Sequence, residues 1–392
     1  MISSKHYFDW AATAPNDEEI LTKALKYSMD HWGNPSSIHK AGTDAKAALE
    51  NARKRAAQAL GVNAENIFFT SGGTEGDHLA LLSVLSRPQK GSVVLSSIEH
   101  PALREMAKSM QNCGWKVINV NPDKNGIVSA QSISDALQED TAFVSVMAVN
   151  NETGAIQPIY EIAKIIEEKT KGKRKPFFHV DCVQAAGKIP LNLKASGIDS
   201  ASFSAHKIGG SRGIGILYLA KEFNSFLKGG GQEKTVRSGT ENLFGAEAFS
   251  LCLEKYFISE RNASAEKRFE QQKILTANFI KKLKKIKGCV IIPHCREDEK
   301  FEANFSPWVV QAAFPGIPGQ VMERALSEKG FFISTGRACS SSHKGRPVLD
   351  TMQLSQKEKE SAVRFSFGFS TEEESMNELI EELKNICRQF LQ

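Results

Sequence analysis

Short apolar runs of strand length recur along the first 220 residues, and they constrain the fold more than any other feature. The runs cover residues 67–70, 93–95, 142–149, 177–180, 201–203 and 214–219. Helical patterns separate several of them, as at residues 159–169. Buried strands joined by helical crossovers are typical of a mostly parallel sheet covered on both faces. The sequence therefore predicts an α/β fold.

The pattern changes near residue 250, where a long charged helical stretch over residues 251–287 is predicted. Strands are predicted at 290–292 and 309–314, and helices at 318–329 and 371–390. We therefore expect a large domain over residues 16–250 and a smaller α+β domain over residues 251–392. Residues 1–15 are expected to be an N-terminal segment that packs with the small domain.

Composition argues against several classes of protein. Hydrophobic residues make up 41% and charged residues 24% of the 392 residues, as in an ordinary globular protein. The net charge of +5 is weak for this length and no basic run carries aromatic residues, so direct nucleic-acid binding is not expected. No apolar stretch is long enough to cross a membrane. The seven cysteines form no C-x-x-C pair, which predicts no disulfide framework and a cytoplasmic location.

A lysine, Lys207, comes soon after the predicted strand at 201–203. The carboxyl ends of strands are where open α/β sheets bind ligands, and lysine can form a Schiff base with a cofactor aldehyde. Ser204 and His206 beside it can donate hydrogen bonds to a phosphate. The alternative is a solvated lysine in a turn that is rich in glycine, and the motif alone favours that alternative.

An aspartate, Asp181, ends the run at 177–180. A buried carboxylate is costly without a cationic or donor partner, and a pyridinium nitrogen is such a partner. Gln184, three residues later, is placed to reach a ring hydroxyl. The alternative is an aspartate that caps a helix.

Three more strand ends carry polar or small residues. Gly73 and Thr74 lie between a strand and a helix, where free N–H groups bind anions, although the turn lacks a Walker sequence. His100 either stacks on an aromatic cofactor or is structural. Asn151 offers a donor and an acceptor to a cofactor hydroxyl or a substrate carboxylate.

One cysteine, Cys339, stands in a small, polar stretch with glycines at 336 and 345. Such a stretch is typical of an exposed loop, whereas free cysteines are more often buried. Arg337, His343 and Lys344 favour the thiolate, which is the nucleophilic form of the side chain. The sequence therefore predicts a reactive cysteine.

These six motifs, in this order, resemble those of the cysteine desulfurases, the NifS-like members of the class V aminotransferases. The resemblance runs from residues 8–13 to residues 364–368 and includes residues 33–39 and 236–241. It implies the PLP-dependent transferase fold type I. That fold has a large PLP-binding domain with a mostly parallel seven-stranded sheet, and here the small C-terminal domain would carry the persulfide loop.

The resemblance also implies a reaction. Lys207 would hold pyridoxal 5′-phosphate as a Schiff base, and Cys339 would attack the sulfur of L-cysteine, leaving L-alanine and a Cys339 persulfide. Asp181 would pair with the pyridine nitrogen of the cofactor, Gln184 would bond to the ring oxygen, and His100 would stack on the ring and transfer protons. The phosphate would be bound by Gly73, Thr74, Ser204 and His206. Asn151 and Arg364 would bind the substrate or the cofactor. Thr240 would complete the phosphate cradle of the neighbouring subunit, which implies a homodimer.

The implied partner is a sulfur acceptor, such as an iron–sulfur scaffold or a tRNA-thiolation enzyme. The length of the stretch from Cys339 to Pro347 resembles the mobile-loop branch of the family. No resident metal is expected, although Cys339 could transiently ligate an iron–sulfur cluster held with a scaffold. The sequence departs from the family pattern at Ala14, at 76–78, at Arg337 and after Gly368, and none of these departures removes a proposed catalytic group.

Other interpretations remain open at this stage. A selenocysteine lyase or another class V aminotransferase-type enzyme would share the fold, but an aminotransferase has no need of Cys339. An interaction protein without activity predicts gaps among the lysine, aspartate and cysteine positions, and none is seen. A nicotinamide dehydrogenase requires a G-x-G-x-x-G after an early strand, which the sequence lacks.

Overall fold

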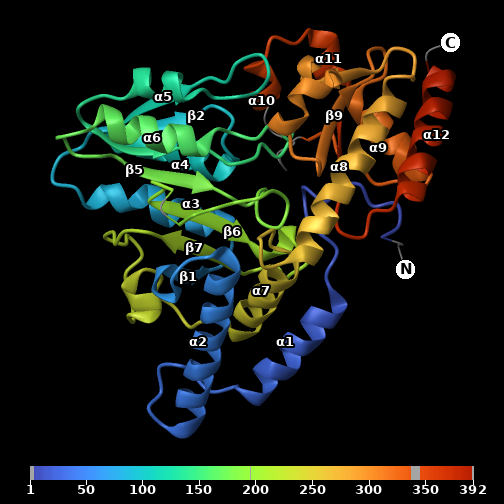
Figure 1. Cartoon of the computed structure of the whole chain (residues 1–392). Coiled ribbons are helices and arrows are strands. Elements are labelled where there is room, and N and C mark those ends of the chain that lie inside the picture. Colours follow the sequence, from blue (N-terminus) through green and yellow to red (C-terminus); the bar gives the residue numbers. More distant parts are fainter. Residues whose placement is uncertain (1–3, 195, 337–344, 391–392) are drawn as a thin grey trace.

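A seven-stranded sheet forms the centre of the computed structural model, which describes residues 4–194, 196–336 and 345–390 (Figure 1). The strands lie in the order β1-β7-β6-β5-β4-β2-β3, and only β7 runs antiparallel to its two neighbours. Their bounds are β1 (Ile67–Thr70), β2 (Ser92–Ser96), β3 (Lys116–Val120), β4 (Thr141–Ser145), β5 (Phe177–Asp181), β6 (Ser200–Ser204) and β7 (Gly215–Leu219). The predicted α/β fold with a mostly parallel sheet is confirmed.

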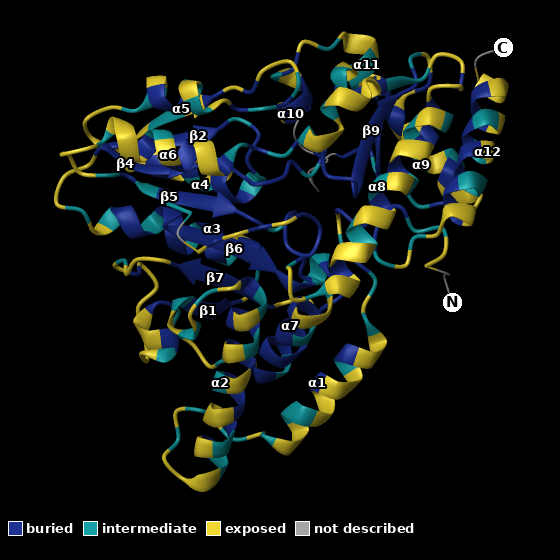
Figure 2. Ribbon diagram, viewed as in Figure 1, coloured by how far each residue is buried: buried dark blue, intermediate teal, exposed yellow. Residues whose placement is uncertain are grey.

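Both faces of this sheet are covered, as the continuous apolar runs predict. Along β2, Val93 and Leu95 pack into one apolar cluster and Val94 into another, because successive side chains of a strand point to opposite faces. Figure 2 shows the strands as the buried centre between helices with exposed outer surfaces. The helices are α1 (Glu18–Asp30), α2 (Lys40–Leu60), α3 (Gly73–Leu82), α4 (Pro101–Asn112), α5 (Ala130–Ala136), α6 (Ile159–Lys169), α7 (Leu243–Tyr256), α8 (Ala263–Leu283), α9 (Gly319–Glu328), α10 (Pro347–Asp350), α11 (Gln356–Ser361) and α12 (Glu373–Phe390).

A second, antiparallel sheet lies beside the first, at the upper right of Figure 1. It has the order β10-β9-β8, with bounds β8 (Val290–Ile292), β9 (Val309–Ala313) and β10 (Ala362–Ser366). Its own core includes Trp308 and Phe365, and Phe8 from the start of the chain is buried in the same core. Asp9 also forms a bridge to Ser366. The N-terminal segment therefore runs between the second sheet and the first.

The helical stretch predicted over residues 251–287 is interrupted. It comprises the end of α7 and the whole of α8, because the chain leaves the helix after Tyr256 and buries Phe257. The Asn262 side chain then accepts a hydrogen bond from the Ala265 N–H (3.1 Å) and starts α8. Residue 250 itself lies inside α7, whose Cys252 belongs to the core of the large sheet.

Of the helices that the structure describes, none combines the length and the apolar character needed to cross a membrane.

Candidate active site

The carboxyl ends of five strands that run in one direction carry the predicted site residues. Lys207 ends the 3₁₀ turn η3 (Ala205–Lys207), which follows β6. Asp181 is the last residue of β5, and His100 lies four residues after β2. Asn151 follows β4, and Gly73 begins the helix after β1. The fold therefore brings residues that are far apart in sequence to one edge of the sheet.

The N-terminal segment crosses this edge and binds the lysine through its backbone. Nζ of Lys207 donates to the carbonyl oxygens of Ala11 and Ala12, both at 2.7 Å. Nε2 of the buried Gln184 also donates to the Ala11 carbonyl (2.9 Å). Ala11 O is thus a shared acceptor that places the Lys207 amine and the Gln184 amide side by side.

The Gln184 amide is oriented by a second lysine that the sequence analysis did not select. Nζ of Lys188, which is only 2% exposed, donates to Oε1 of Gln184 (2.9 Å). Burial, together with the charges of Lys207 and Arg364, lowers the pKa of Lys188 to about 7. With Oε1 occupied by this donor, the N–H groups of Gln184 face the N-terminal segment and the site.

His100 precedes α4 and caps its first turn. Its Nδ1 accepts from the Ala102 N–H (3.2 Å), so the neutral ring carries its proton on Nε2. Burial and the positive charge of Lys207 lower the pKa of His100 to about 4. The imidazole is therefore neutral at pH 7 and able to take up a proton.

Asp181 lies in a buried acidic environment. Its Oδ1 accepts from the Val183 N–H (2.8 Å), while burial and the charge of Asp77 raise its pKa to about 7. Behind it, Oδ1 of Asp77 on α3 lies 3.0 Å from Nε2 of His179, and Nδ1 of His179 lies 2.7 Å from Oγ of Ser200. A carboxyl in such surroundings is stabilised in its charged form when a cation lies beside it.

Gly73, the first residue of α3 after the β1 turn, has no room for a side chain. A Cβ atom at Gly73 would lie 2.5 Å from Cγ2 of Val183 and 3.8 Å from Cβ of Ser204. Gly73 and Thr74 open the helix, where the first N–H groups have no partner within the helix. The β1–α3 turn and the end of β6 therefore form one wall of backbone donors and small residues, which suits an anion.

His206, next to the lysine, faces the N-terminal segment. Its Nδ1 lies 3.1 Å from Oγ1 of Thr13, and its carbonyl accepts from the Ala14 N–H (2.7 Å). Burial and the charge of Lys207 lower the pKa of His206 to about 4. At pH 7 this ring is neutral and serves as a hydrogen-bonding group.

Arg364 reaches the site from the second sheet. It lies on β10 and is 4% exposed. Its Nη2 donates a hydrogen bond to Oδ1 of Asp9 (2.6 Å), and its Nη1 donates one to the Asn151 carbonyl (3.0 Å). Its cross-strand partner on β9 is Gln311. Among the residues that the structure describes, Nε of Arg364 and both amide atoms of Gln311 have no hydrogen-bond partner. Buried polar atoms of this kind are rare, so this place is suited to a polar ligand.

Two predicted residues stand apart from this group. Thr240 is exposed, and no hydrogen bond within the described chain joins it to the wall around Gly73. Its neighbour Arg237 binds Oε1 of Glu75 in the first turn of α3 (3.2 Å). Cys339 lies outside the described residues.

Lys188, Asp77 and His179 belong to the site although sequence reasoning gave them no role there. The spacing of four residues between Gln184 and Lys188 was the available signal for one of them. The contact between Asp77 and His179 joins residues 102 positions apart, and nothing in the local sequence announces it. Gln311 is found only through its pairing with Arg364.

Comparison with known proteins gives the class. The family profile described as aminotransferase class-V matches residues 6–379. The chain belongs to this family, in its NifS-like cysteine desulfurase branch. The family depends on pyridoxal phosphate.

Similar proteins in the branch cover nearly the whole chain. A protein of Lactobacillus delbrueckii named NifS/IcsS protein homolog is 36% identical, over 98% of this chain and 97% of its own length. The cysteine desulfurase IscS of Dictyoglomus turgidum is 32% identical, over 98% and 95%. A solved structure described as a NifS-like protein has a TM-score of 0.86 and 32% identity, over 98% of this chain and 99% of its own.

Proposed function

We propose that the chain is a pyridoxal-phosphate-dependent cysteine desulfurase in which Lys207 holds the cofactor and Cys339 receives the sulfur. The observation that carries the proposal is the meeting of the Lys207 amine, the Gln184 amide and the Asp181 carboxyl at the carboxyl ends of β5 and β6. The family relationship supports the activity, and the arrangement of side chains supports the residue roles.

The side chains present fit pyridoxal phosphate. Lys207 supplies the amine for its aldehyde, and Asp181 supplies an acid for its ring nitrogen. The wall at Gly73, where a Cβ would collide with Val183, leaves backbone donors for its phosphate, and Thr74, Ser204 and His206 add side-chain donors. Bound at this place, the cofactor would supply an electron sink for the bonds around the substrate Cα.

The remaining groups handle the substrate. Arg364 and Asn151 would bind the carboxylate of L-cysteine, for which the planar guanidinium is well shaped. In support, Arg364 is held by Asp9 and by the backbone carbonyl of Asn151. His100 is neutral at pH 7 because burial lowers its pKa to about 4, so it can accept a proton and return it. Lys207 is the second group that can move a proton at the substrate Cα.

The net reaction balances without an added oxidant. The Cys339 thiolate bonds to the sulfur of the substrate while the substrate carbon–sulfur bond breaks and its electron pair stays on carbon. That carbon takes up a proton, so L-cysteine and the Cys339 thiol become L-alanine and a Cys339 persulfide. The persulfide then passes its outer sulfur to an acceptor, which we propose to be an iron–sulfur scaffold or a tRNA-thiolation enzyme.

A homodimer is part of the proposal. Four large apolar side chains of the region formed by α1, α2 and the turn between them are exposed: Leu25 by 53%, Met29 by 68%, Trp32 by 78% and Ile38 by 98%. Exposed apolar groups on an extended element, which projects downward in Figure 1, suit a subunit interface. Thr240, exposed in the single chain, would then serve the phosphate wall of the other subunit.

A large and a small domain, with residues 1–15 on the small one, complete the proposed organisation. The two apolar cores, with Phe8 in the core of the second sheet, support that division. A cytoplasmic location is proposed as well. The six cysteines within the described residues are unpaired, as a reducing compartment would leave them.

The test of the reaction is an absorption spectrum of the purified protein before and after L-cysteine, with alanine and reductant-released sulfide measured in the same tube. We expect a yellow protein, a spectral shift, and both products. Lys207→Ala should lose the native absorption band, and Cys339→Ala should form no persulfide. A colourless protein that stays inert after pyridoxal phosphate is added would contradict the proposal. A preference for selenocysteine with full turnover in Cys339→Ala would indicate a selenocysteine lyase instead.

The test of the shared site mixes Lys207→Ala with Thr240→Val, each of which we expect to be inactive alone. If Thr240 acts across the interface, a mixed dimer contains one site with both wild-type residues. Random mixing should then restore about a quarter of the wild-type activity. No recovery in a preparation shown to contain mixed dimers would contradict a shared site.

A further inference from the structure

Arg346 lies just beyond residues 337–344, and its side chain reaches back to the residues just before them. The guanidinium is buried, with the residue 6% exposed. It donates to the Thr335 carbonyl through Nη2, and to the carbonyls of Lys359 and Ala362 through Nη1, both at 2.8 Å. The two ends of the segment that contains Cys339 are therefore joined by one side chain.

Each end is also fixed separately. Oε2 of Glu323 on α9 accepts from the Thr335 N–H (3.2 Å), and Oδ2 of Asp350 accepts from the Arg346 N–H (2.9 Å). Gly336 has a φ of +78°, and a Cβ there would lie 3.4 Å from Nη2 of Arg346 and 3.5 Å from Nε2 of Gln311. The backbone thus leaves the second sheet beside Gln311, the cross-strand partner of Arg364.

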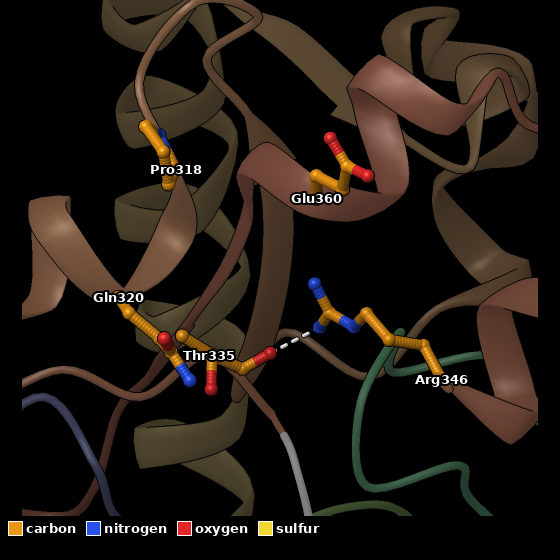
Figure 3. Close-up of a pocket in the computed structure, with 5 residues that line it drawn as sticks. All are labelled: Pro318, Gln320, Thr335, Arg346 and Glu360. Carbon is orange, nitrogen blue, oxygen red and sulfur yellow. Dashed lines mark hydrogen bonds between the residues drawn. The ribbon is translucent and has the colours of Figure 1, made fainter. Parts of the chain in front are cut away.

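Figure 3 shows the Arg346 guanidinium beside Thr335 in a small cavity. Arg346 points across a cavity of about 180 Å³ and meets the Thr335 carbonyl on the far side, with Pro318, Gln320 and Glu360 along the walls. Nη2 also lies 3.9 Å from Oε2 of Glu152. A planar fork can serve several carbonyls at once, whereas the ammonium of a lysine is a compact point charge.

We propose that Arg346 is a positioning residue for sulfur transfer, which fixes both ends of the Cys339-bearing segment next to the Arg364 site. The proposal rests on the proposed function, because it concerns the step in which Cys339 meets the substrate sulfur. Arg346 takes no part in that chemistry. It sets the positions of Thr335 and residue 346 on either side of Cys339 in the sequence, and a small misplacement of a reacting group costs a large factor in rate.

The described hydrogen bonds of Arg346 join other residues than those of the proposed cofactor site. Lys207, Asp181 and Gln184 hold the proposed cofactor site from β5 and β6, and none of their described hydrogen bonds involves Arg346. Loosening Arg346 should therefore slow persulfide formation and leave cofactor binding and the cysteine-induced spectral shift in place.

The test compares the wild-type holoenzyme with Arg346→Lys, which keeps the charge and loses the fork, and with Arg388→Lys, an exposed matched control. The first readout is alkylation by iodoacetamide without substrate, with Cys339 measured by mass spectrometry against the exposed Cys113 in the same chain. The second is the single-turnover rate of Cys339 persulfide formation. For Arg346→Lys we expect about threefold faster alkylation of Cys339 and about tenfold slower persulfide formation, since Thr335 and residue 346 would no longer be joined by the guanidinium.

A second variant, Glu323→Gln, weakens the hold on Thr335 from the other side and should shift both readouts in the same directions. Unchanged readouts in both variants would overturn the proposal. So would an equal loss of cofactor binding and thermal stability in both, because Arg346 would then support the fold as a whole. A wild-type protein that makes no alanine would refute the proposed function. The ratio of Cys339 to Cys113 alkylation would still test whether Arg346 fixes both ends of the segment.

Discussion

Nζ of Lys188 donates to Oε1 of Gln184 across 2.9 Å in the interior of the protein. Both residues are almost fully buried, and the amide donates in turn to the Ala11 carbonyl. A glutamine side chain can turn either its oxygen or its nitrogen to a ligand. The buried amine of Lys188, by donating to Oε1, settles that choice, so a lysine outside the proposed reacting groups decides what Gln184 offers to the cofactor ring.

Replacement of this lysine by methionine should therefore weaken cofactor binding without unfolding the protein. We expect Lys188→Met to raise the Kd for pyridoxal phosphate about tenfold, equivalent to roughly one hydrogen bond. The melting temperature should change by no more than a few degrees, because methionine removes a costly buried amine but also leaves the buried Oε1 of Gln184 without its donor. Absorbance titration and thermal unfolding measure the two effects. Lys164→Met on the exposed face of α6 is the control, and an equal Kd for the two variants would refute the role.

The pKa of His100 gives a pH prediction. Burial and the nearby Lys207 ammonium lower it to about 4, so in the cofactor-free protein the ring should stay neutral from pH 8 down to about 5. Lys207→Ala removes one positive charge, which favours the imidazolium, so the midpoint should move up toward 6.5. Histidine NMR across pH 3.5–8 measures both midpoints. A wild-type midpoint near 6.5, or a downward shift in the variant, would be inconsistent with this electrostatic coupling.

The role of Gly73 can be tested by adding a Cβ atom there and then removing the methyl group with which that atom collides. Gly73→Ala places a Cβ 2.5 Å from Cγ2 of Val183, so the turn must shift and the proposed phosphate site with it. We expect at least about tenfold weaker binding of pyridoxal phosphate, as for a mispositioned binding group. Gly73→Ala with Val183→Ala removes the colliding methyl and should restore most of the affinity. If the double variant binds no better than the single one, the collision is not the cause.

A buried ion pair stabilises the segment that leads to Thr240. Nη1 and Nη2 of Arg53 bind the two carboxylate oxygens of Glu233, both at 2.7 Å, and Oε2 of Glu233 also accepts from the Phe69 N–H. Glu233 and the next two residues have positive φ values of 47°, 52° and 67°. Such backbone is strained in residues other than glycine and persists only where its surroundings hold it.

Arg53→Ala leaves the Glu233 carboxylate buried without its cation. We expect a loss of about 3 kcal/mol in the free energy of unfolding, measured from urea unfolding. The control is Lys40→Ala, which breaks the exposed pair with Asp44 (2.8 Å) and should cost less than about 0.5 kcal/mol. Similar losses in the two variants would show that the buried pair contributes no more than a surface pair.

The buried strands could be predicted from sequence because their signals are local. Apolar runs marked six of the seven strands of the large sheet, and polar residues at their ends marked Lys207 and Asp181. Strand β3 was missed because it lies at the edge of the sheet, and only Val120 of its five residues is buried. Strand β10 was missed because Arg364 and Ser366 break its apolar pattern.

The polar contacts within the site follow from topology and could not be read from the sequence. Asp77 contacts His179 because α3 packs against the sheet at β5, and Asp9 contacts Arg364 because the N-terminal segment runs along β10. The residues next to each partner in the sequence do not predict such a contact. The break between α7 and α8 was missed for a related reason, since Asn262 caps a helix without any glycine or proline nearby.

The acceptor shared by Lys207 and Gln184 is a backbone oxygen, that of Ala11. A carbonyl survives every side-chain replacement, so substitutions at Ala11, which is buried, would report how well the new side chain packs and not the hydrogen bonds that the oxygen accepts. What selection must preserve there is the path of the chain, fixed by the side chains of neighbours such as Phe8 and Asp9. Substitution of Phe8 or Asp9 would therefore displace the Lys207 amine and the Gln184 amide, although neither residue lies next to them in the sequence.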